Sequence, residues 1–179
     1  MDDTTMIPQA LKGVAQQVAT GDLPGNARVG GLLHEAHRQF LSEDAGRVAD
    51  YIPALADADP DLFGLAMVEV SGQEYDAGDS LHMFSLQSIS KMFVYALAIQ
   101  EHGHARVREI VGVNNTGLPF NSVMALELNN GHPMNPMVNA GAIATTALIA
   151  GADDDERWRR ISEGLSLFAG RDLDVDEDV

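Results

Sequence analysis

Ser88 and Lys91 form a Ser-x-x-Lys pair, whose residue types and spacing could support acyl transfer. In a helix, an i, i+3 spacing places both side chains on one face. A serine hydroxyl becomes an effective nucleophile when a base removes its proton, and a lysine can be that base where burial favours its neutral form. Free N–H groups at a helix N-terminus would stabilise the developing oxyanion. Alternatively, Ser85 and Ser90 could cap the helix while Lys91 extends to the surface.

Other combinations of residues are weaker candidates for chemistry. Two histidine pairs, His34-x-x-His37 and His102-x-His104, have spacings that could bind metal, but no nearby carboxylate pattern completes a known site. We interpret them as helix-surface and helix-end residues. The stretch 117–122 lacks the Gly-Lys-Ser/Thr of a phosphate-binding loop. The sequence therefore predicts no metal site.

The composition excludes several classes of function. The 179 residues include 27 acidic and 11 basic side chains, giving a net charge of −16. This charge argues against binding to nucleic acid or to anionic membranes, which needs clustered Lys and Arg. With no cysteine, the chain has no disulfides and no thiolate nucleophile. The first residues lack the pattern of a signal peptide, and no apolar run reaches membrane-spanning length, so the sequence predicts a cytoplasmic protein.

The first half of the chain predicts helices followed by a hairpin. Residues 1–25 carry a weak helical pattern, and residues 27–42 form an amphipathic one. Pro53 fits the first turn of a short helix. The apolar run 63–70 is typical of a core strand, and residues 74–80 can return as its antiparallel partner across a Ser-Gly-Gln turn.

The second half predicts helices. Residues 85–101 are apolar around most of the helical circumference, which predicts a buried helix that carries Ser88 and Lys91. Residues 139–150 predict another closely packed helix. The acidic run 153–156 predicts the start of the next helix, where negative charge suits the helix dipole. The order of elements indicates an α+β fold.

Three segments in this order resemble the serine-dependent glutaminase family, which has a β-lactamase-like fold. The first is 46–56, Gly-Arg-Val-Ala-Asp-Tyr-Ile-Pro-Ala-Leu-Ala. The second is 84–91, Phe-Ser-Leu-Gln-Ser-Ile-Ser-Lys, which is similar to the family's nucleophile motif along its whole length. The third joins Phe-Asn-Ser at 120–122 to Asn-Pro-Met-Val-Asn-Ala-Gly-Ala-Ile at 135–143. Three collinear motifs are far more specific than one tetrapeptide.

The resemblance implies hydrolysis of L-glutamine to L-glutamate and ammonia, without metal or organic cofactor. It implies that Ser88 is the nucleophile, that Lys91 is its base and that the Ser88 N–H forms half of the oxyanion hole. Tyr51, Gln87 and Asn139 occupy motif positions that line the substrate pocket in this family. Side chains such as Asn and Gln suit an amide substrate because each offers both donors and acceptors. The resemblance also implies a homo-oligomer, commonly a tetramer.

The resemblance further implies a division of the chain and an incomplete domain. We expect 1–25 to be a helical extension and 26–179 to be part of the catalytic domain, with 26–105 holding the helix, hairpin and nucleophile helix and 106–179 a helical subdomain. The antiparallel sheet flanked by helices would lack its C-terminal strands. Asn-Asn-Thr-Gly at 114–117 replaces the family's usual Glu-Pro-Ser-Gly. We therefore expect little or no turnover by these 179 residues alone.

Two rival interpretations stay open at this point. A penicillin-recognising or β-lactamase-type hydrolase shares Ser-x-x-Lys and the fold. It would also need Ser-Asp-Asn and Lys-Thr-Gly motifs, and neither occurs in this chain. The other rival is a non-catalytic fragment that acts only in binding or assembly.

Overall fold

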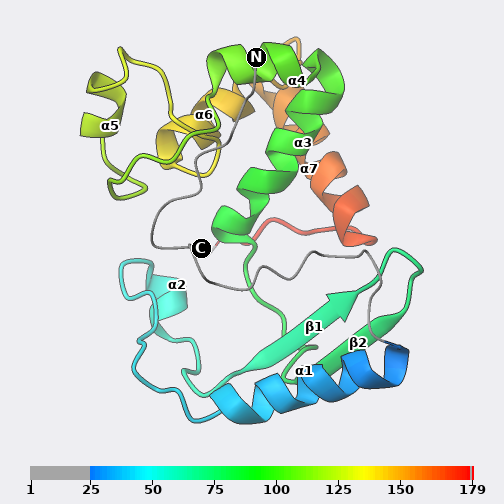
Figure 1. Cartoon of the computed structure of the whole chain (residues 1–179). Helices are drawn as coiled ribbons and strands as arrows, with labels where there is room; N and C mark the ends of the chain where they lie inside the picture. Colours follow the sequence, from blue (N-terminus) through cyan, green and yellow to red (C-terminus); the bar gives the residue numbers. More distant parts are fainter. Residues whose placement is uncertain (1–24, 178) are drawn as a thin grey trace, which may run out of the picture. The chain divides into compact units, whose positions relative to one another are not determined.

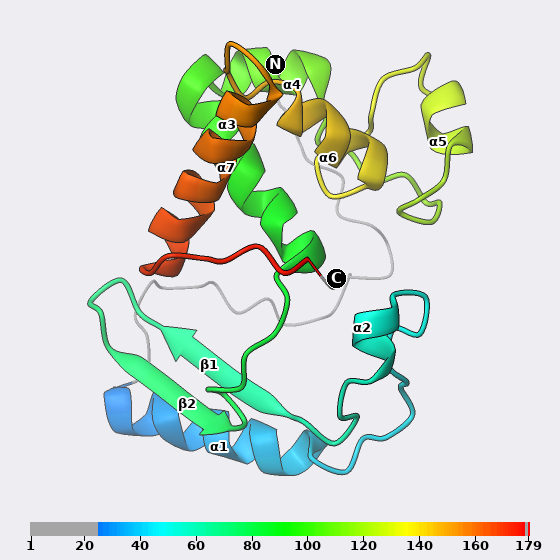
Figure 2. The same cartoon turned by 180° about the vertical axis from the view of Figure 1, so that it is seen from behind.

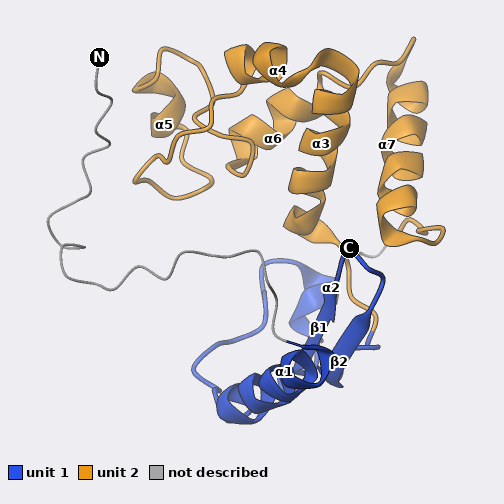
Figure 3. Cartoon of the chain, turned by 45° about the vertical axis from the view of Figure 1, so that its right-hand side comes forward, with its two compact units in different colours: residues 1–82 blue, residues 83–179 orange. Residues whose placement is uncertain are grey.

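The computed structural model describes residues 25–177 and 179, and they form two compact units that meet in the sequence at His82 and Met83 (Figure 3). The expected helix within 1–25 lies outside the described residues, apart from Gly25. The first unit contains α1, α2 and a two-stranded sheet, and the second contains helices alone (Figure 1). The α+β class expected from the sequence is confirmed.

The first unit is an antiparallel hairpin with one long helix along it. Strands β1 (Gly64–Val68) and β2 (Glu74–Gly78) pair in a register that sets Gly64 opposite Gly78 and Val68 opposite Glu74. Helix α1 (Asn26–Phe40) runs along one face of this hairpin in both views (Figures 1 and 2). The short helix α2 (Pro53–Ala56) begins at the predicted proline.

A polar and aromatic contact joins α1 to the end of the hairpin. The His37 ring stacks on Phe63 with centroids 4.9 Å apart, and its Nε2–H donates to the Phe63 carbonyl at 3.0 Å. Gly78 has φ +66°, and a Cβ added there would lie 2.1 Å from His37 Nε2. Glycine is therefore required at this position both by backbone conformation and by space.

The prediction of a core strand at 63–70 is wrong about burial. The strand forms, but Val68 is 65% exposed. Helix α1 covers one face of the two-stranded sheet, so alternate side chains of β1 face away from it. An uninterrupted apolar run indicates a strand that could be buried on both faces, and this sheet is buried on only one.

The second unit is built around α3 (Ser90–His102). Helices α4 (His104–Ile110), α6 (Asn139–Thr146) and α7 (Asp154–Ala169) pack against it, and α5 (Met124–Glu127) is a single turn in the segment before α6. The buried core of this unit comes from α3, α4, α7 and the residues after α6: Val94, Ala98, Val107, Ile149 and Ile161. These side chains hold α3 in a fixed position relative to α4 and α7.

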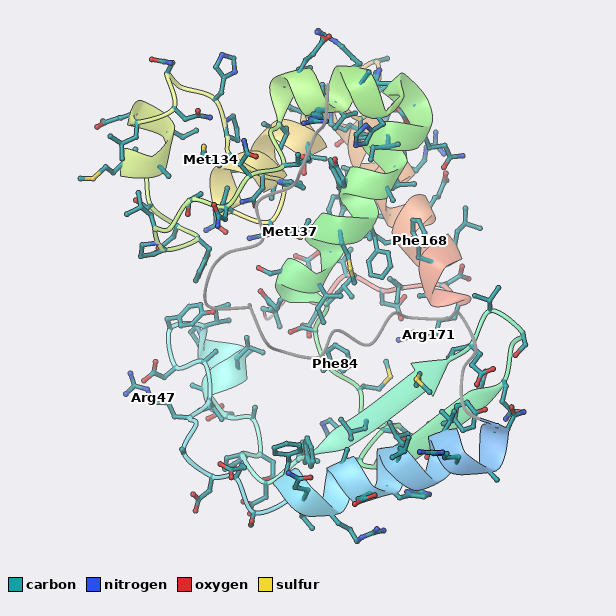
Figure 4. All side chains as sticks on the ribbon, viewed as in Figure 1. Arg47, Phe84, Met134, Met137, Phe168 and Arg171 are labelled. Atoms are coloured by element: carbon teal, nitrogen blue, oxygen red, sulfur yellow. The ribbon has the colours of Figure 1, made fainter. Side chains whose placement is uncertain are left out.

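Close packing between α3 and α7 depends on a small residue and a ring pair. Gly164 on α7 faces Leu97, because a Cβ added to it would lie 2.5 Å from Leu97 Cδ1. One turn further along α7, the Phe168 ring points toward α3, and its centroid is 4.9 Å from that of Phe93 (Figure 4). Helix α7 begins as predicted, with the Asp153 side chain accepting from the Glu156 N–H at 2.8 Å.

Two expectations about the helices of this unit need correction. The helix expected at 85–101 begins with a 3₁₀ turn, η2 (Gln87–Ile89), and is not buried all round, since Ile89 is 43% and Met92 is 50% exposed. Its neighbours cover only part of its circumference. The helix expected at 139–150 ends at Thr146, because the carbonyls that follow bind side chains of α3 and α7 instead of continuing the helix. Leu148 O accepts from His102, Ile149 O from Arg157 and Ala150 O from Arg160.

Candidate active site

Ser88 is exposed and lies in the 3₁₀ turn η2, which leads into α3. The residue before it, Gln87, has φ +40°, a left-handed conformation that is uncommon for a residue with a side chain. The turn is held by Ser90 Oγ, which donates to Gln87 O at 2.8 Å, and by the Ile89 N–H, which donates to Leu86 O at 3.0 Å. Such backbone strain persists only where the surroundings enforce it, and it is concentrated at functional sites.

Lys91 is one helical turn beyond Ser88 and is surrounded by three electron-rich groups. Its Nζ donates to Asn139 Oδ1 at 2.6 Å and to the carbonyl of Met137 at 3.1 Å. Nζ also lies 5.6 Å from the centroid of the Phe120 ring. Two hydrogen bonds to oxygen and the contact with the aromatic ring together hold Nζ in this place.

The segment before α6 is shaped so that these acceptors face α3. Asn135 Oδ1 accepts from the N–H groups of Met137 and Val138 at 2.9 and 3.1 Å, and its Nδ2 donates to Asn114 O at 2.8 Å. Gly141 lies directly against this turn, because a Cβ added there would be 1.8 Å from Asn135 O. The chain therefore returns to α3 at Met137, which Figure 4 labels beside the lower part of α3.

Phe120 and Asn139 are joined through the main chain as well as through Lys91. The Asn139 N–H donates to Phe120 O at 2.9 Å. Asn139 is also the first residue of α6, so its backbone is fixed while its side chain is exposed. The third sequence motif thus supplies both the aromatic ring and the amide that contact Lys91.

A pocket of about 570 Å³ lies between α3 and α6 and contains both members of the Ser-x-x-Lys pair. Its lining residues are Gln87, Ser88, Ser90, Lys91, Val94, Ala142, Ile143, Thr146, Ala147 and Arg157. Two of them are cations, Lys91 and Arg157, and none is a carboxylate. In a chain of net charge −16, this local excess of positive charge favours a ligand with oxygen acceptors or a negative group.

A second, larger hollow of about 970 Å³ adjoins the first, because Gln87, Ser90, Val94 and Thr146 line both. Its other walls come from residues 83–86, from α7 and from the chain that follows α7. Arg171 ties that chain back, donating to Met83 Sδ at 3.7 Å. The 3₁₀ turn that contains Ser88 therefore borders two adjoining hollows.

The structure brings four of the five predicted site residues into one unit. Gln87, Ser88 and Lys91 line the pocket, and Asn139 reaches it through its hydrogen bond to Lys91. Tyr51 belongs to the other unit, where its side chain is 79% exposed, so its contact with substrate stays a prediction.

Sequence reasoning missed three contributors to the site. The Phe120 ring lies within the third motif, but its motif position did not reveal the contact with Lys91. The Met137 acceptor is a main-chain carbonyl. Every residue type has this group, so the sequence could not identify it. Arg157 comes from the acidic start of α7, where it is one of three nearby arginines and gave no distinct signal.

The histidine pairs are not grouped for metal binding among residues 25–177 and 179. His37 and His102 each donate to a main-chain carbonyl. In this described part of the chain, no three His, Cys, Asp or Glu side chains come together as metal ligands would. No helix within the same residues combines the length and apolar character needed to cross a bilayer.

Comparison with known sequences gives one consistent result. A sequence model of the glutaminase family matches residues 46–179. "Glutaminase 2" of Yersinia pestis is 47% identical over 167 residues, which cover 93% of this chain and 49% of that protein. A glutaminase of Brucella canis is 52% identical over 147 residues, covering 82% of this chain and 46% of that protein. The chain thus spans about half the length of these relatives.

Comparison with solved structures agrees with the sequence matches. A probable glutaminase, ybaS, superimposes with a TM-score of 0.83 at 43% identity, covering 88% of this chain and 50% of the other. A structure titled "Mglu in its tris and glutamate form" matches with a TM-score of 0.71 at 39% identity, over 83% of this chain and 33% of the other. The fold expected from the motifs is therefore confirmed over the matched residues.

Proposed function

The chain belongs to the glutaminase family, and on that premise we propose that it carries the nucleophile portion of a site that hydrolyses L-glutamine to L-glutamate and ammonia. The observation that carries the proposal is the pocket that contains both Ser88 and Lys91. Its polar groups suit an amide substrate, and a structure of the related Mglu was determined in a glutamate form.

In this mechanism Ser88 Oγ attacks the side-chain amide carbon of glutamine while its proton passes to Lys91 Nζ in its neutral form. The carbonyl electron pair moves onto oxygen, and the Ser88 backbone N–H stabilises this oxyanion. When the tetrahedral intermediate collapses, its C–N bond breaks and Lys91 returns the proton to the leaving group as ammonia. Water then adds to the glutamyl ester, Oγ recovers a proton, and glutamate leaves.

The other site residues would bind the substrate rather than react with it. Gln87 and Asn139 offer amide donors and acceptors to the polar groups of glutamine. Tyr51 would add a hydrogen bond from its hydroxyl group, as the family resemblance implies. The exposed position of Ser88 and the φ of Gln87 support a nucleophile presented at a tight turn.

Covalent trapping tests the proposal without requiring turnover. The 179-residue chain is incubated with an activated γ-ester of L-glutamate, and the acylated residue is located by mass spectrometry of peptides. We expect a glutamyl group on Ser88, none in Ser88→Ala, and normal acylation in the control Ser71→Ala, whose serine lies in the hairpin turn. Lys91→Ala should slow acylation by about 100-fold or more. Acylation elsewhere, or equal acylation of Ser88→Ala, would contradict the nucleophile assignment.

The same experiment separates the catalytic proposal from a binding-only protein. A chain that binds L-glutamate but leaves Ser88 unmodified by the ester would be a non-catalytic module. A chain acylated by the glutamate ester, and not by a penicillin, would exclude the penicillin-recognising alternative. Either outcome is independent of how fast the ester hydrolyses.

We also propose that the protein is a homo-oligomer, with a tetramer as the family resemblance implies. Large apolar side chains between α4 and α6 support association, since Val123 is 69% and Leu128 is 75% exposed. Sedimentation equilibrium over a range of concentrations would give the mass. A single monomeric species at high concentration would contradict this proposal.

A further inference from the structure

Asn139 is bound to Lys91 in the free protein, although the proposed function needs each of them for a different task. Lys91 Nζ and Asn139 Oδ1 are 2.6 Å apart, which is short for a hydrogen bond between a nitrogen and an oxygen. The Asn139 side chain is exposed, while its main chain is held by Phe120 O at the start of α6. The amide can therefore change partner without moving the helix.

The contacts of Lys91 use Nζ as a donor and fix its orientation. Both hydrogen bonds run from Nζ to oxygen, one on Asn139 and one on Met137, and the Phe120 ring presents a π face. A lysine that takes the serine proton needs a free lone pair on Nζ. Of the three groups, only the Asn139 amide is a side chain with hydrogen-bonding atoms that a ligand could occupy instead.

We propose that Asn139 is exchanged between Lys91 and the ligand, so that substrate binding frees Lys91 to turn toward Ser88. This inference rests on the proposed function. The ammonium or amide N–H groups of glutamine take over Asn139 Oδ1, and Lys91 loses its shortest hydrogen bond. Lys91 then turns its Nζ lone pair toward Ser88 and accepts the proton of that serine. Asn139 is thus a positioning residue for Lys91 as well as a contact for substrate.

The exchange explains why the segment before Asn139 is so firmly held. Asn135 fixes the N–H groups of Met137 and Val138, and Gly141 fits against Asn135 O. These contacts keep the Met137 carbonyl on Lys91 when Asn139 leaves. Lys91 would therefore stay beside Ser88 during the exchange instead of extending into solvent.

The lysine content of the chain makes a direct test feasible. Lys91 and Lys12 are its only lysines, so protein labelled with ¹³C at lysine Cε gives two resonances, assigned with Lys91→Arg. We expect Asn139→Leu to move the Lys91 resonance in the ligand-free protein. The control Asn129→Leu should leave the Lys91 resonance in place. The Asn129 side chain is likewise hydrogen-bonded, donating to the His132 carbonyl, but it lies in a different turn.

Titration with L-glutamate, the proposed product, tests the exchange itself. In the unmodified chain the Lys91 resonance should shift saturably toward its position in Asn139→Leu, and in Asn139→Leu it should shift little. Asn139→Asp has the same shape but adds a charge that holds Lys91 more firmly, so the shift should need about tenfold more glutamate. Thermal unfolding of each variant confirms that it is folded.

Three outcomes would overturn the exchange. The first is an unchanged Lys91 resonance in ligand-free Asn139→Leu. The second is a titration in which glutamate shifts the backbone amide resonances of Gln87 and Ser88 but leaves the Lys91 resonance in place. The third is a titration in which glutamate shifts no resonance. Failure of the proposed function is seen separately, as absence of Ser88 acylation by the activated ester. Acylated Ser88 with an unmoved Lys91 would leave the function standing and reject the exchange.

Discussion

The two compact units of this chain differ in how they bury their apolar side chains. In the helical unit, Val107 and Ala98 are fully buried and belong to a core that three helices and Ile149 share. In the hairpin unit, the buried apolar side chains within residues 25–82 are Val29 and Ala77, while Val68 and Val70 are largely exposed. Both units contain apolar patterns in their sequences, but only in the helical unit do several elements pack together and bury these side chains in a core.

This difference shows where the site residues get their fixed geometry. The groups around Lys91 come from α3, from the start of α6 and from the segment before it, all within the unit that has the core. A packed core holds side chains in single rotamers and resists small displacements. The stability of the helical unit should therefore depend on its apolar side chains more strongly than the stability of the hairpin unit does.

The same substitution in each unit should give the largest contrast. Val107→Ala removes two methyl groups from a side chain with no exposure, and it should lower the free energy of unfolding by about 2–3 kcal/mol. Val68→Ala, at a residue that is 65% exposed, should change it by less than about 0.5 kcal/mol. Urea denaturation followed by circular dichroism measures both. An equal loss for Val68→Ala would mean that another surface covers this face of the sheet in solution.

The hairpin unit should nevertheless be sensitive at one glycine. Gly78→Ala places a Cβ within 2.1 Å of His37 Nε2 and 2.3 Å of Phe63 O at a φ of +66°, so it should cost about 1–3 kcal/mol. Amide hydrogen exchange of β1 and β2 would show the loss locally. Gly72→Ala is the matched control, since its φ is +85° but no atom lies within 4 Å of the added Cβ. A greater loss in Gly72→Ala would contradict the role of the His37 contact.

In the helical unit, the start of α7 should contribute a smaller amount. Asp153→Ala removes the acceptor for the Glu156 N–H and should cost about 1 kcal/mol. Asp155→Ala, in the same first turn but without a capping hydrogen bond, should cost a few tenths of a kcal/mol through the helix dipole. Chemical denaturation of the two variants side by side provides the measurement. Identical losses would assign the effect to charge alone.

The smallest effect concerns the stability of the hairpin unit at high pH. Burial, the hydrogen bond from Tyr75 Oη to Glu69 Oε1 and the negative charge of Glu69 raise the pKa of Tyr75 to about 12. The unfolded chain loses this proton near pH 10, so the contribution to stability is complete below pH 10 and is lost as the pH rises through about 12. Tyr75→Phe should remove this part of the pH dependence in denaturation experiments, and Glu69→Gln should move it to lower pH.

Much of the local structure could be predicted from residue patterns alone. Pro53 marked α2, the Ser-Gly-Gln turn marked the hairpin, and the acids at 153–156 marked the start of α7. Each of these signals acts between residues that are close in sequence. The end of α6 could not be predicted in this way, because the side chains that bind the carbonyls after it come from α3 and α7.

Burial was predicted less well than secondary structure, for a physical reason. The apolar run of β1 and the apolar circumference of α3 show what a side chain would gain from burial, but not which neighbour provides it. Val68 and Met92 are exposed although both belong to strongly apolar segments. The number of faces that are covered depends on how many elements pack around a strand or helix.

For the site, the amino-acid sequence by itself determined the family and predicted a chemistry. The spacing of Ser88 and Lys91 and the order of three motifs indicated acyl transfer by a glutaminase, because reactive residue types and their local spacing are written in the chain. Only the tertiary structure decided what surrounds Lys91. Its partners are an amide 48 residues away, a main-chain carbonyl and an aromatic ring, and only folding brings groups so distant in sequence within hydrogen-bonding distance.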